Sequence, residues 1–384
     1  MLAPLFSTLA AAAALAPRAM AASNDSTIPG IYSSATVDFL RALPKVEHHI
    51  HIEGALSPEL LFKLARRNNV TLDSGNFSSP DAVRERYRNF ANLANFVTVS
   101  EAEMAVFLVE EDYEDLAYSY LERSSYDGLA HAEVNFLPEG HTMRGVGLET
   151  VVRGLKKGLK RGEQDFKITS ELFACFSKSH NHTATMETID DLARFVPSGD
   201  IIGLGAAGNE DGFPPSEFKE VYGHAASIGF NPSHFTIHAG ETGPPSYVRE
   251  AAFSLDLPRI DHAVQAGLQD PELVREMAER GKFVTLCPTS NVALKVYETV
   301  GDAPLKTFLD AGLKFSLGTD DPTFFGSFIL DVYLQVHRAF LLSKETWIQI
   351  VRNSIDGTWT TEERKEELRK RLEEVVEEWE GRDI

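Results

Sequence analysis

The chain has 384 residues, of which 43% are hydrophobic, and a formal net charge of −20 at pH 7. This length and apolar content allow one large domain or two smaller ones with a substantial core. The negative charge repels a phosphate backbone, so we expect no nucleic-acid partner. Cys175 and Cys287 are the only cysteines, which excludes a disulfide framework and a zinc site built from several thiolates.

The N-terminal stretch is rich in alanine and ends in Ala19-Met20-Ala21-Ala22. It resembles a signal peptide, but the positive charge that usually precedes the apolar core is missing. We interpret residues 1–40 as an N-terminal extension, a signal or transit segment among the alternatives, and residues 41–384 as one domain. We expect a cytoplasmic location, with secretion as the alternative if residues 1–22 act as a signal peptide. Prolines interrupt the apolar run, so we expect no membrane span.

The rest of the chain alternates between short apolar stretches and helical patterns. The expected strands cover residues 45–54, 129–137, 167–176, 201–207, 235–239, 260–264, 283–287 and 315–318. The expected helices cover residues 57–69, 112–127, 150–164, 185–195, 215–228, 246–255, 271–280, 305–311, 329–342, 344–354 and 360–379. Eight strand–helix units in about 310 residues predict a (β/α)8 barrel rather than an open sheet. Residues 72–100 are expected to form an inserted loop with short helices, and the last helix is charged and amphipathic.

Side chains that commonly bind metals gather at the ends of the expected strands. His49 and His51 end the first strand, and alternate residues of a strand share a face, so their imidazoles project side by side. His238 ends the fifth strand and Asp320 follows the eighth, and a closed barrel brings these ends to one mouth. Imidazole and carboxylate groups bind zinc, so these four residues predict a catalytic metal site with an open position for water.

Further acids and bases lie beside the expected ligands. Glu241 is three residues beyond His238, where it can pass protons, and His262 in the sixth strand can accept a proton from water or orient it. Asp321 is adjacent to Asp320, so it projects differently and is expected to face a substrate. Each residue alone has a more ordinary explanation, as a core histidine, a turn aspartate or a surface glutamate. The joint pattern at several strand ends favours the site.

Two other patterns carry less weight. The triplet His180-Asn181-His182 repeats the His-x-His spacing, but it lies in a polar stretch without a strand signal, so we interpret it as solvated. The stretch Gly203–Gly208 matches Gly-x-Gly-x-x-Gly, but a loop follows it where a dinucleotide site needs a helix. These glycines are expected to let the backbone approach a ligand.

The motifs together resemble those of the adenosine and adenine deaminase family, within the amidohydrolase superfamily. The resemblance covers about Leu43 to Ser354 and is closest to the adenine deaminase branch. Its motifs are Leu43-Pro44-Lys45, His49-x-His51-x-Glu53-Gly54, His238-Ala239-Gly240-Glu241, Asp261-His262, Cys287-Pro288-Thr289-Ser290-Asn291 and Thr319-Asp320-Asp321-Pro322. The adenine branch is suggested by Pro58–Leu64, Ala132-Glu133-Val134, His141-Thr142, Gly243-Pro244-Pro245 and Phe324-Phe325-Gly326.

The resemblance implies a cofactor, a substrate and a role for each site residue. It implies one Zn2+ per subunit, bound by His49, His51, His238 and Asp320. It implies that Glu241 protonates N1 of a 6-aminopurine while water, activated by His262, adds at C6, and that ammonia leaves. The implied substrate contacts are Asp321 at N7, the Gly208 amide near N3, and Glu53. The expected partner is a small purine, and a homo-oligomer is an open alternative.

The chain departs from the adenine branch mainly around the substrate pocket. Leu137 stands where that branch has Asp, Ala206–Glu210 replaces Asp-Ser-Ser-Glu, and Ala263 replaces Gly. Gly318-Thr319 replaces Asn-Ser, and Cys287-Pro288-Thr289 is more typical of the adenosine branch. Adenine is therefore the leading substrate, with adenosine or an N6-substituted adenine nucleoside or nucleotide as the alternative. Two further hypotheses stay open: a metal-dependent amide or ester hydrolase, and a non-catalytic purine-binding barrel.

Overall fold

The computed structural model describes residues 32–73, 75, 77–90 and 93–384. The expected signal or transit segment therefore lies outside the described residues. Within the described ranges, no helix combines the length and the apolar character that a membrane crossing requires.

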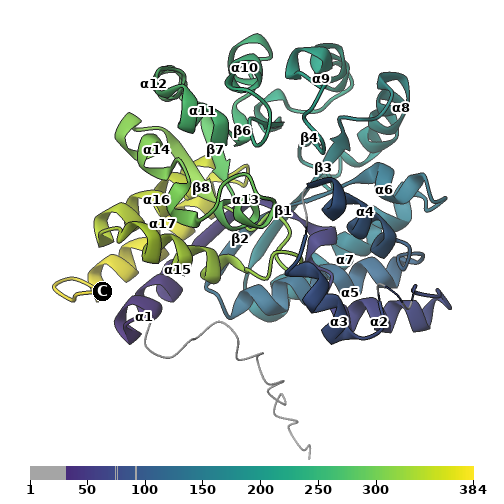
Figure 1. Ribbon diagram of the computed structural model, residues 1–384, viewed down its shortest axis with the longest axis horizontal. Coiled ribbons are helices and arrows are strands. Elements are labelled where there is room, and N and C mark those ends of the chain that lie inside the picture. Colours follow the sequence, from purple (N-terminus) through teal and green to yellow (C-terminus); the bar gives the residue numbers. More distant parts are fainter. Residues whose placement is uncertain (1–31, 74, 76, 91–92) are drawn as a thin grey trace, which may run out of the picture.

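Eight parallel strands form a closed barrel in the described part of the chain, which confirms the predicted fold (Figure 1). The first four strands pair in the order β1-β2-β3-β4, and the last four pair in the order β5-β6-β7-β8. Parallel bridges between Ile50 and Asp320 and between Leu204 and Phe235 close the two seams. The strands are β1 (Lys45–His51), β2 (Leu129–Phe136), β3 (Thr169–Ser177), β4 (Leu204–Ala207), β5 (His238–Ala239), β6 (Arg259–His262), β7 (Phe283–Leu286) and β8 (Lys314–Leu317).

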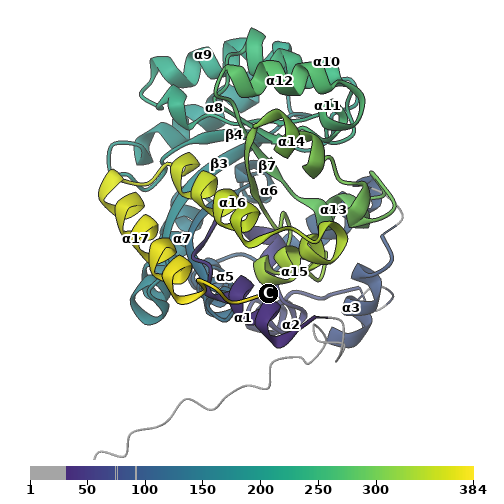
Figure 2. The ribbon, with the colours of Figure 1, turned by 90° about the vertical axis from the view of Figure 1, so that its left-hand side faces the viewer.

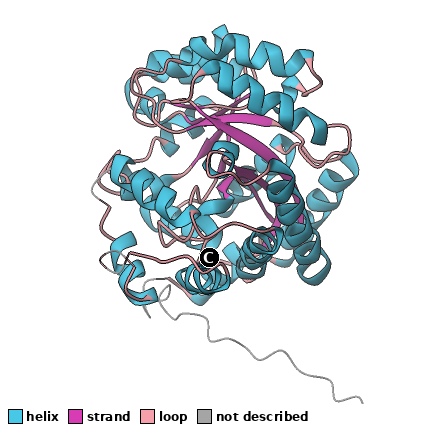
Figure 3. Ribbon diagram, turned by 90° about the vertical axis from the view of Figure 1, so that its right-hand side faces the viewer, coloured by secondary structure: helices cyan, strands magenta, loops and turns pink. Residues whose placement is uncertain are grey.

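Helices surround the strands on all sides (Figures 2 and 3). Those that follow the strands or connect them are α2 (Pro58–Arg67), α5 (Glu110–Ser125), α6 (Pro138–Thr142), α7 (Leu148–Phe166), α8 (His182–Leu192), α9 (Lys219–Ser227), α10 (Pro245–Arg249), α11 (Val264–Gln269), α12 (Pro271–Glu279), α13 (Pro288–Ala293), α14 (Leu305–Ala311), α15 (Ile329–Phe340) and α16 (Lys344–Gly357). The expected insertion holds α3 (Pro80–Tyr87) and α4 (Leu93–Met104), and the charged C-terminal helix is α17 (Glu362–Glu378).

Local sequence signals fix several helix starts. The Ser57 side chain accepts a hydrogen bond from the Leu60 amide, and Pro58 occupies the first turn of α2. Asn181 accepts a hydrogen bond from the Thr183 amide and caps α8, so the polar His180-Asn181-His182 triplet is a helix start. An N-cap side chain satisfies an amide that has no partner within the helix.

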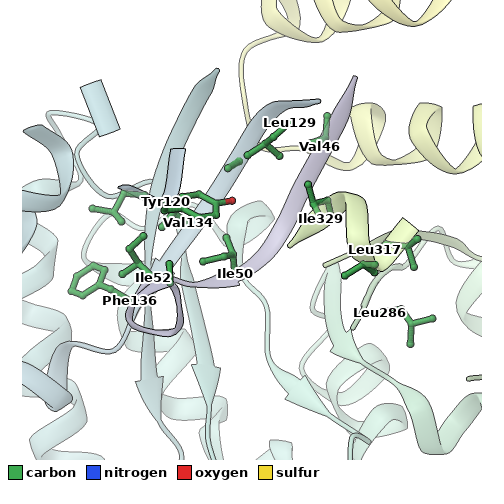
Figure 4. Close-up of a cluster of buried hydrophobic side chains, with 14 of the residues drawn as sticks. Val46, Ile50, Ile52, Tyr120, Leu129, Val134, Phe136, Leu286, Leu317 and Ile329 are labelled. Atoms are coloured by element: carbon green, nitrogen blue, oxygen red, sulfur yellow. The ribbon is translucent and has the colours of Figure 1, made fainter. Parts of the chain in front are cut away.

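The hydrophobic core lies mainly between the strands and their covering helices. Val46 and Ile50 of β1 lie beside Val134 of β2, Tyr120 of α5 and Ile329 of α15 (Figure 4). All five side chains are at most 1% exposed. This apolar layer holds β1 in place, so the remaining positions of β1 are free to carry the polar residues of the site.

Three strands are each three residues shorter than the sequence predicts. The first of them, β1, ends at His51 rather than at residue 54, because Ile52–Ala55 form a 3-10 turn. The ladder of β4 begins at Leu204 rather than at residue 201, and β5 holds only His238 and Ala239. The flanking residues are still bonded to neighbouring strands, since Ile202 donates to the Leu172 carbonyl and Thr236 donates to the Leu204 carbonyl. These stretches therefore form single contacts rather than a continuous ladder.

The sequence prediction lacks one helix, α1 (Ser34–Ala42), which lies beside the N-terminal end of β1. Its Phe39 and Leu40 are fully buried. The ammonium group of Lys45 in β1 donates to the carbonyls of Leu40 and Leu43, which lack partners at the end of a helix. The expected boundary between residues 40 and 41 falls inside this helix.

A buried ion pair crosses the barrel interior. Arg259 at the start of β6 donates to Glu133 of β2 over 2.5 Å, and both side chains are at most 1% exposed. Glu133 also accepts from Thr358 and from the Trp359 amide, which lie between α16 and α17. Burial opposes ionisation of Glu133, but Arg259 outweighs it and lowers the pKa of Glu133 to about 2. The pair therefore links both halves of the barrel to the C-terminal helices.

We expect Glu133→Gln to lower the free energy of unfolding by about 3 kcal/mol, because it leaves the Arg259 charge buried without its partner. The folded-state pKa of Glu133 lies below its ordinary value of 4.5, so the wild-type contribution is complete above pH 4.5 and is lost as the pH falls toward 2. Urea unfolding at pH 7 and pH 4 measures both effects. An unfolding free energy equal to that of the wild type would contradict the prediction.

Candidate active site

Five side chains predicted from the sequence meet at the mouth of the barrel. The Nε2 atom of His51 lies 3.2 Å from Nε2 of His238 and 3.3 Å from Oδ1 of Asp320. Nε2 of His49 lies 3.3 Å from the same oxygen. One ligand atom from each of His49, His238, His262 and Asp320 lies within 4.8 Å of the others, and all four residues are buried. Ends of β1, β5 and β6 and the loop after β8 thus converge on one point.

The outer nitrogens of two of these histidines are held by the barrel. Nδ1 of His49 lies 2.9 Å from the hydroxyl of Thr285, which itself donates to Asp261 over 2.7 Å. Nδ1 of His238 lies 3.0 Å from the Ala206 carbonyl, which can only accept. Both contacts favour the tautomer with the proton on Nδ1 and leave a lone pair on Nε2 at the centre of the cluster, the arrangement of a metal-binding histidine.

The cluster has the chemistry of a cation site. Burial and the neighbouring imidazole of His49 lower the pKa of His238, so its ring is neutral and able to bind a metal. Burial opposes protonation of His49, but Cys287, Asp261 and Asp320 raise its pKa, which shows that the surrounding groups favour positive charge at this point. Nε2 of His49 is buried and has no hydrogen-bond partner among the described residues. A divalent cation among these groups would satisfy both features.

Glu241 lies in the loop after β5 and faces His262. One carboxylate oxygen accepts from the Asn291 amide over 2.9 Å, and the other lies 3.8 Å from Nε2 of His262. Burial and the nearby Asp320 and Glu210 raise the pKa of Glu241 to about 8. A carboxyl group that holds its proton near neutral pH can act as a proton donor.

A second acidic pair lies beside the cluster. Asp321 packs so closely on Gly54 that a Cβ atom at Gly54 would lie 2.2 Å from the Asp321 carboxylate. Burial and the neighbouring Asp320 and Glu53 raise the pKa of Asp321. Glu53 accepts from the Leu137 amide over 3.0 Å and lies 2.9 Å from Nε2 of His141. The glycine in the Glu53-Gly54 motif therefore allows the two strand ends to meet.

The backbone is strained where the site residues leave their strands. Asp320, His262 and Ala263 have φ angles of 64°, 67° and 50°, in the left-handed region. This conformation costs a residue with a side chain roughly 1–2 kcal/mol. Because glycine adopts positive φ angles without this cost, it suits the position that Ala263 occupies here. The same backbone conformation turns the side chains of His262 and Asp320 toward the mouth.

The structure brings together most of the residues that the sequence singled out. His49, His51, His238, His262 and Asp320 form the cluster, with Glu241 in contact with it. Asp321 and Glu53 adjoin it through Gly54. Gly208 follows β4 at the same face of the barrel with φ 96°, and open space lies beside it, with the Ser177 hydroxyl 3.8 Å from an added Cβ.

Three residues of the site have no role in the sequence prediction. Asp261 lies 3.6 Å from Nδ1 of His49 and 3.5 Å from Nδ1 of His238, Thr285 bridges to it, and Asn291 holds Glu241. Asp261 and Asn291 belong to two of the family motifs, so the sequence marks both residues, but it does not indicate which side chains they contact. Thr285 carries no such signal, because a threonine inside a strand is common.

Comparisons with known proteins agree with this geometry. The family model described as adenosine deaminase matches residues 44–375. The chain belongs to this deaminase family. It is 41% identical to an adenine deaminase of Gibberella zeae over 350 residues, which cover 90% of this chain and 98% of the relative. It is 40% identical to an adenine deaminase of Saccharomyces cerevisiae over 342 residues, with 89% and 98% covered. The chain is thus a hydrolase of carbon–nitrogen bonds, and the predicted family is confirmed.

Solved structures show the same fold. The structure of adenine deaminase from Arthrobacter aurescens matches with a TM-score of 0.81 and 35% identity, covering 87% of this chain and 99% of that one. An amidohydrolase of Burkholderia ambifaria with bound zinc matches with a TM-score of 0.79 and 25% identity, covering 90% and 95%.

Proposed function

We propose that this protein is a zinc-dependent adenine deaminase, which converts adenine and water to hypoxanthine and ammonia. The observation that carries the proposal is the convergence of the Nε2 atoms of His49, His51 and His238 and the Asp320 carboxylate beside the buried acid Glu241. The similarity to adenine deaminases of about 40% identity supports the choice of substrate.

We assign the zinc ligands to His49, His51, His238 and Asp320. A zinc ion bound by these residues supplies a Lewis acid that makes a water molecule nucleophilic near neutral pH. His262 is kept out of this set because its Nε2 lies farther from Asp320, at 4.0 Å, and faces Glu241. His262 orients the attacking water and accepts its proton.

The acids of the mouth act on the purine. Glu241 donates its proton to N1, which draws electron density from C6 and favours addition of the water oxygen there. His262 then passes the proton it took from the water to the amino group, which leaves as ammonia, and the proton of the new C6 hydroxyl returns to the Glu241 carboxylate. Asp321 binds N7, the Gly208 amide binds near N3, and Glu53 holds the end of the loop from β1 against the substrate.

An aromatic wall beside Asp321 suits a flat base. Phe324, three residues beyond Asp321, packs edge-on against Tyr87 and Phe96 of the inserted segment, with ring centroids 4.7 and 5.4 Å apart. These buried rings pack the inserted segment against the loop that carries Asp321. Adenosine is the second candidate, because Gly208 and the Cys287-Pro288-Thr289 motif resemble the adenosine branch.

Turnover of three purines in parallel tests the proposal. We expect the zinc-loaded protein to deaminate adenine with a higher kcat/KM than adenosine or N6-methyl-AMP. The reaction is monitored by the absorbance change at the purine and by the amine released, which is ammonia from adenine and adenosine and methylamine from N6-methyl-AMP. Preference for adenosine would establish the second candidate. Zinc-loaded protein that turns over none of the three would refute purine deamination.

A further inference from the structure

Two oppositely charged side chains lie buried behind the mouth, outside the roles assigned above. Lys178 follows β3, Glu210 follows β4, and each is 1% exposed. The Lys178 ammonium nitrogen lies 3.7 Å from Oε1 of Glu210. Charged side chains are rarely buried this completely unless they are paired and hydrogen-bonded, so the contacts of this pair indicate its role.

The Glu210 carboxylate holds the loop that carries Glu241. It accepts hydrogen bonds from three consecutive backbone amides: Glu241 over 3.3 Å, Thr242 over 3.2 Å and Gly243 over 2.5 Å. A Cβ atom at Gly243 would lie 2.7 Å from the same carboxylate, so the glycine permits the approach. A carboxylate that gathers successive amides fixes the direction of that backbone segment.

Lys178 holds the same segment from its other end. Its ammonium group donates to the carbonyl of His238 over 2.9 Å. This carbonyl lies in β5, directly before the loop. Between the two anchored points lies Gly240, whose φ of 73° marks a sharp turn. The pair therefore grips the chain on both sides of the turn that aims Glu241 at Asn291 and the cluster.

We propose that Lys178 and Glu210 act as positioning residues that fix the Glu241 carboxyl group for proton transfer to the purine. The expected effect on the reaction rate rests on the proposed function. The anchoring of the loop rests only on the hydrogen bonds of Lys178 and Glu210. Proton transfer is sensitive to displacements of about 1 Å, so a loose loop slows the reaction without weakening substrate binding to the same extent.

The kinetic test replaces Lys178 by methionine, which keeps the length of the side chain and removes its charge. We expect kcat for adenine to fall about 10–100-fold, while KM changes by less than about 3-fold and the zinc content stays at the wild-type level. Lys178→Arg, which keeps a charged donor, should retain most of the activity. In a Glu241→Gln background, Lys178→Met should change kcat by less than about 2-fold, because the group being positioned is already gone.

Matched controls separate positioning from a general loss of structure. Glu133→Gln breaks the other buried ion pair, so it should lower the unfolding free energy and leave kcat of the folded enzyme near the wild-type value. Hydrogen exchange of the amides of residues 241–243 gives a readout that needs no activity. It should be faster in Glu210→Gln and in Lys178→Met, and unchanged in Glu133→Gln.

The outcomes distinguish this inference from the proposed function. If the wild type deaminates no purine, the proposed function fails, and the exchange rates alone decide whether the pair anchors the loop. An equal loss of kcat from Lys178→Met with and without Glu241→Gln would overturn positioning through Glu241. Wild-type exchange at residues 241–243 in both single variants would overturn the anchor itself.

Discussion

Glu241→Gln is expected to lower kcat for adenine by about 10²-fold or more and to leave zinc binding intact. The amide has nearly the shape of the carboxyl group and its oxygen can still accept from Asn291, which now bonds the carboxyl over 2.9 Å. It cannot deliver a proton to N1 of the purine. Burial beside Asp320 and Glu210 raises the pKa of the wild-type carboxyl to about 8, so the proton is present near neutral pH.

Steady-state kinetics with adenine and metal analysis on one preparation measure both parts of this expectation. Glu241→Asp is the matched control, since it keeps an acid but shortens the side chain by one methylene, and it should retain more activity than the amide. Wild-type turnover by Glu241→Gln would remove Glu241 from the proton transfer. A loss of zinc would instead assign Glu241 to metal binding.

The cluster was predictable because strand geometry alone places His49 beside His51. Residues two apart in a strand share a face, and the strand ends of a parallel barrel share a mouth. His238, His262 and Asp320 follow from the same rule once the alternation of strands and helices is recognised. These positions require no knowledge of the contacts between side chains.

The supporting contacts lie beyond that rule, because they join residues far apart in the sequence. Thr285 meets His49 across 236 positions, and Thr319 meets Glu47 across 272. No pattern in the sequence distinguishes Lys178 and Glu210 from ordinary surface charges, whereas the structure shows both to be buried. Charge pairs of this kind depend on the relative placement of whole strands, which periodicity does not specify.

Strand length was the least predictable feature of the fold. An apolar run such as residues 235–239 satisfies the pattern of a strand, but only His238 and Ala239 enter the ladder. A neighbouring strand decides how many of those amides find partners. Beyond the short ladder of β5, side chains bond the backbone instead: Lys178 donates to the His238 carbonyl, and Glu210 accepts from amides of the loop that follows.

His49→Ala is expected to weaken zinc binding by about 100-fold or more and to abolish deamination, because it removes one of the few ligands of the proposed site. The neighbouring His48 provides a matched control. Its Nδ1 atom bonds the Ser316 hydroxyl over 2.8 Å, away from the cluster, and its ring packs against Phe283. His48→Asn should therefore keep one zinc ion per chain, although it can cost stability.

Thermal unfolding with and without a chelator measures the same difference without an assay of turnover. A ligand that binds only the folded state at about 1,000 times its dissociation constant stabilises it by about 4 kcal/mol, so chelation should lower the Tm of the wild type and of His48→Asn. His49→Ala should show no chelator-dependent shift, because it has little metal to lose. If His49→Ala kept stoichiometric zinc, the metal would not bind where the three strand ends and the loop after β8 converge. The proposed chemistry would then be contradicted as well.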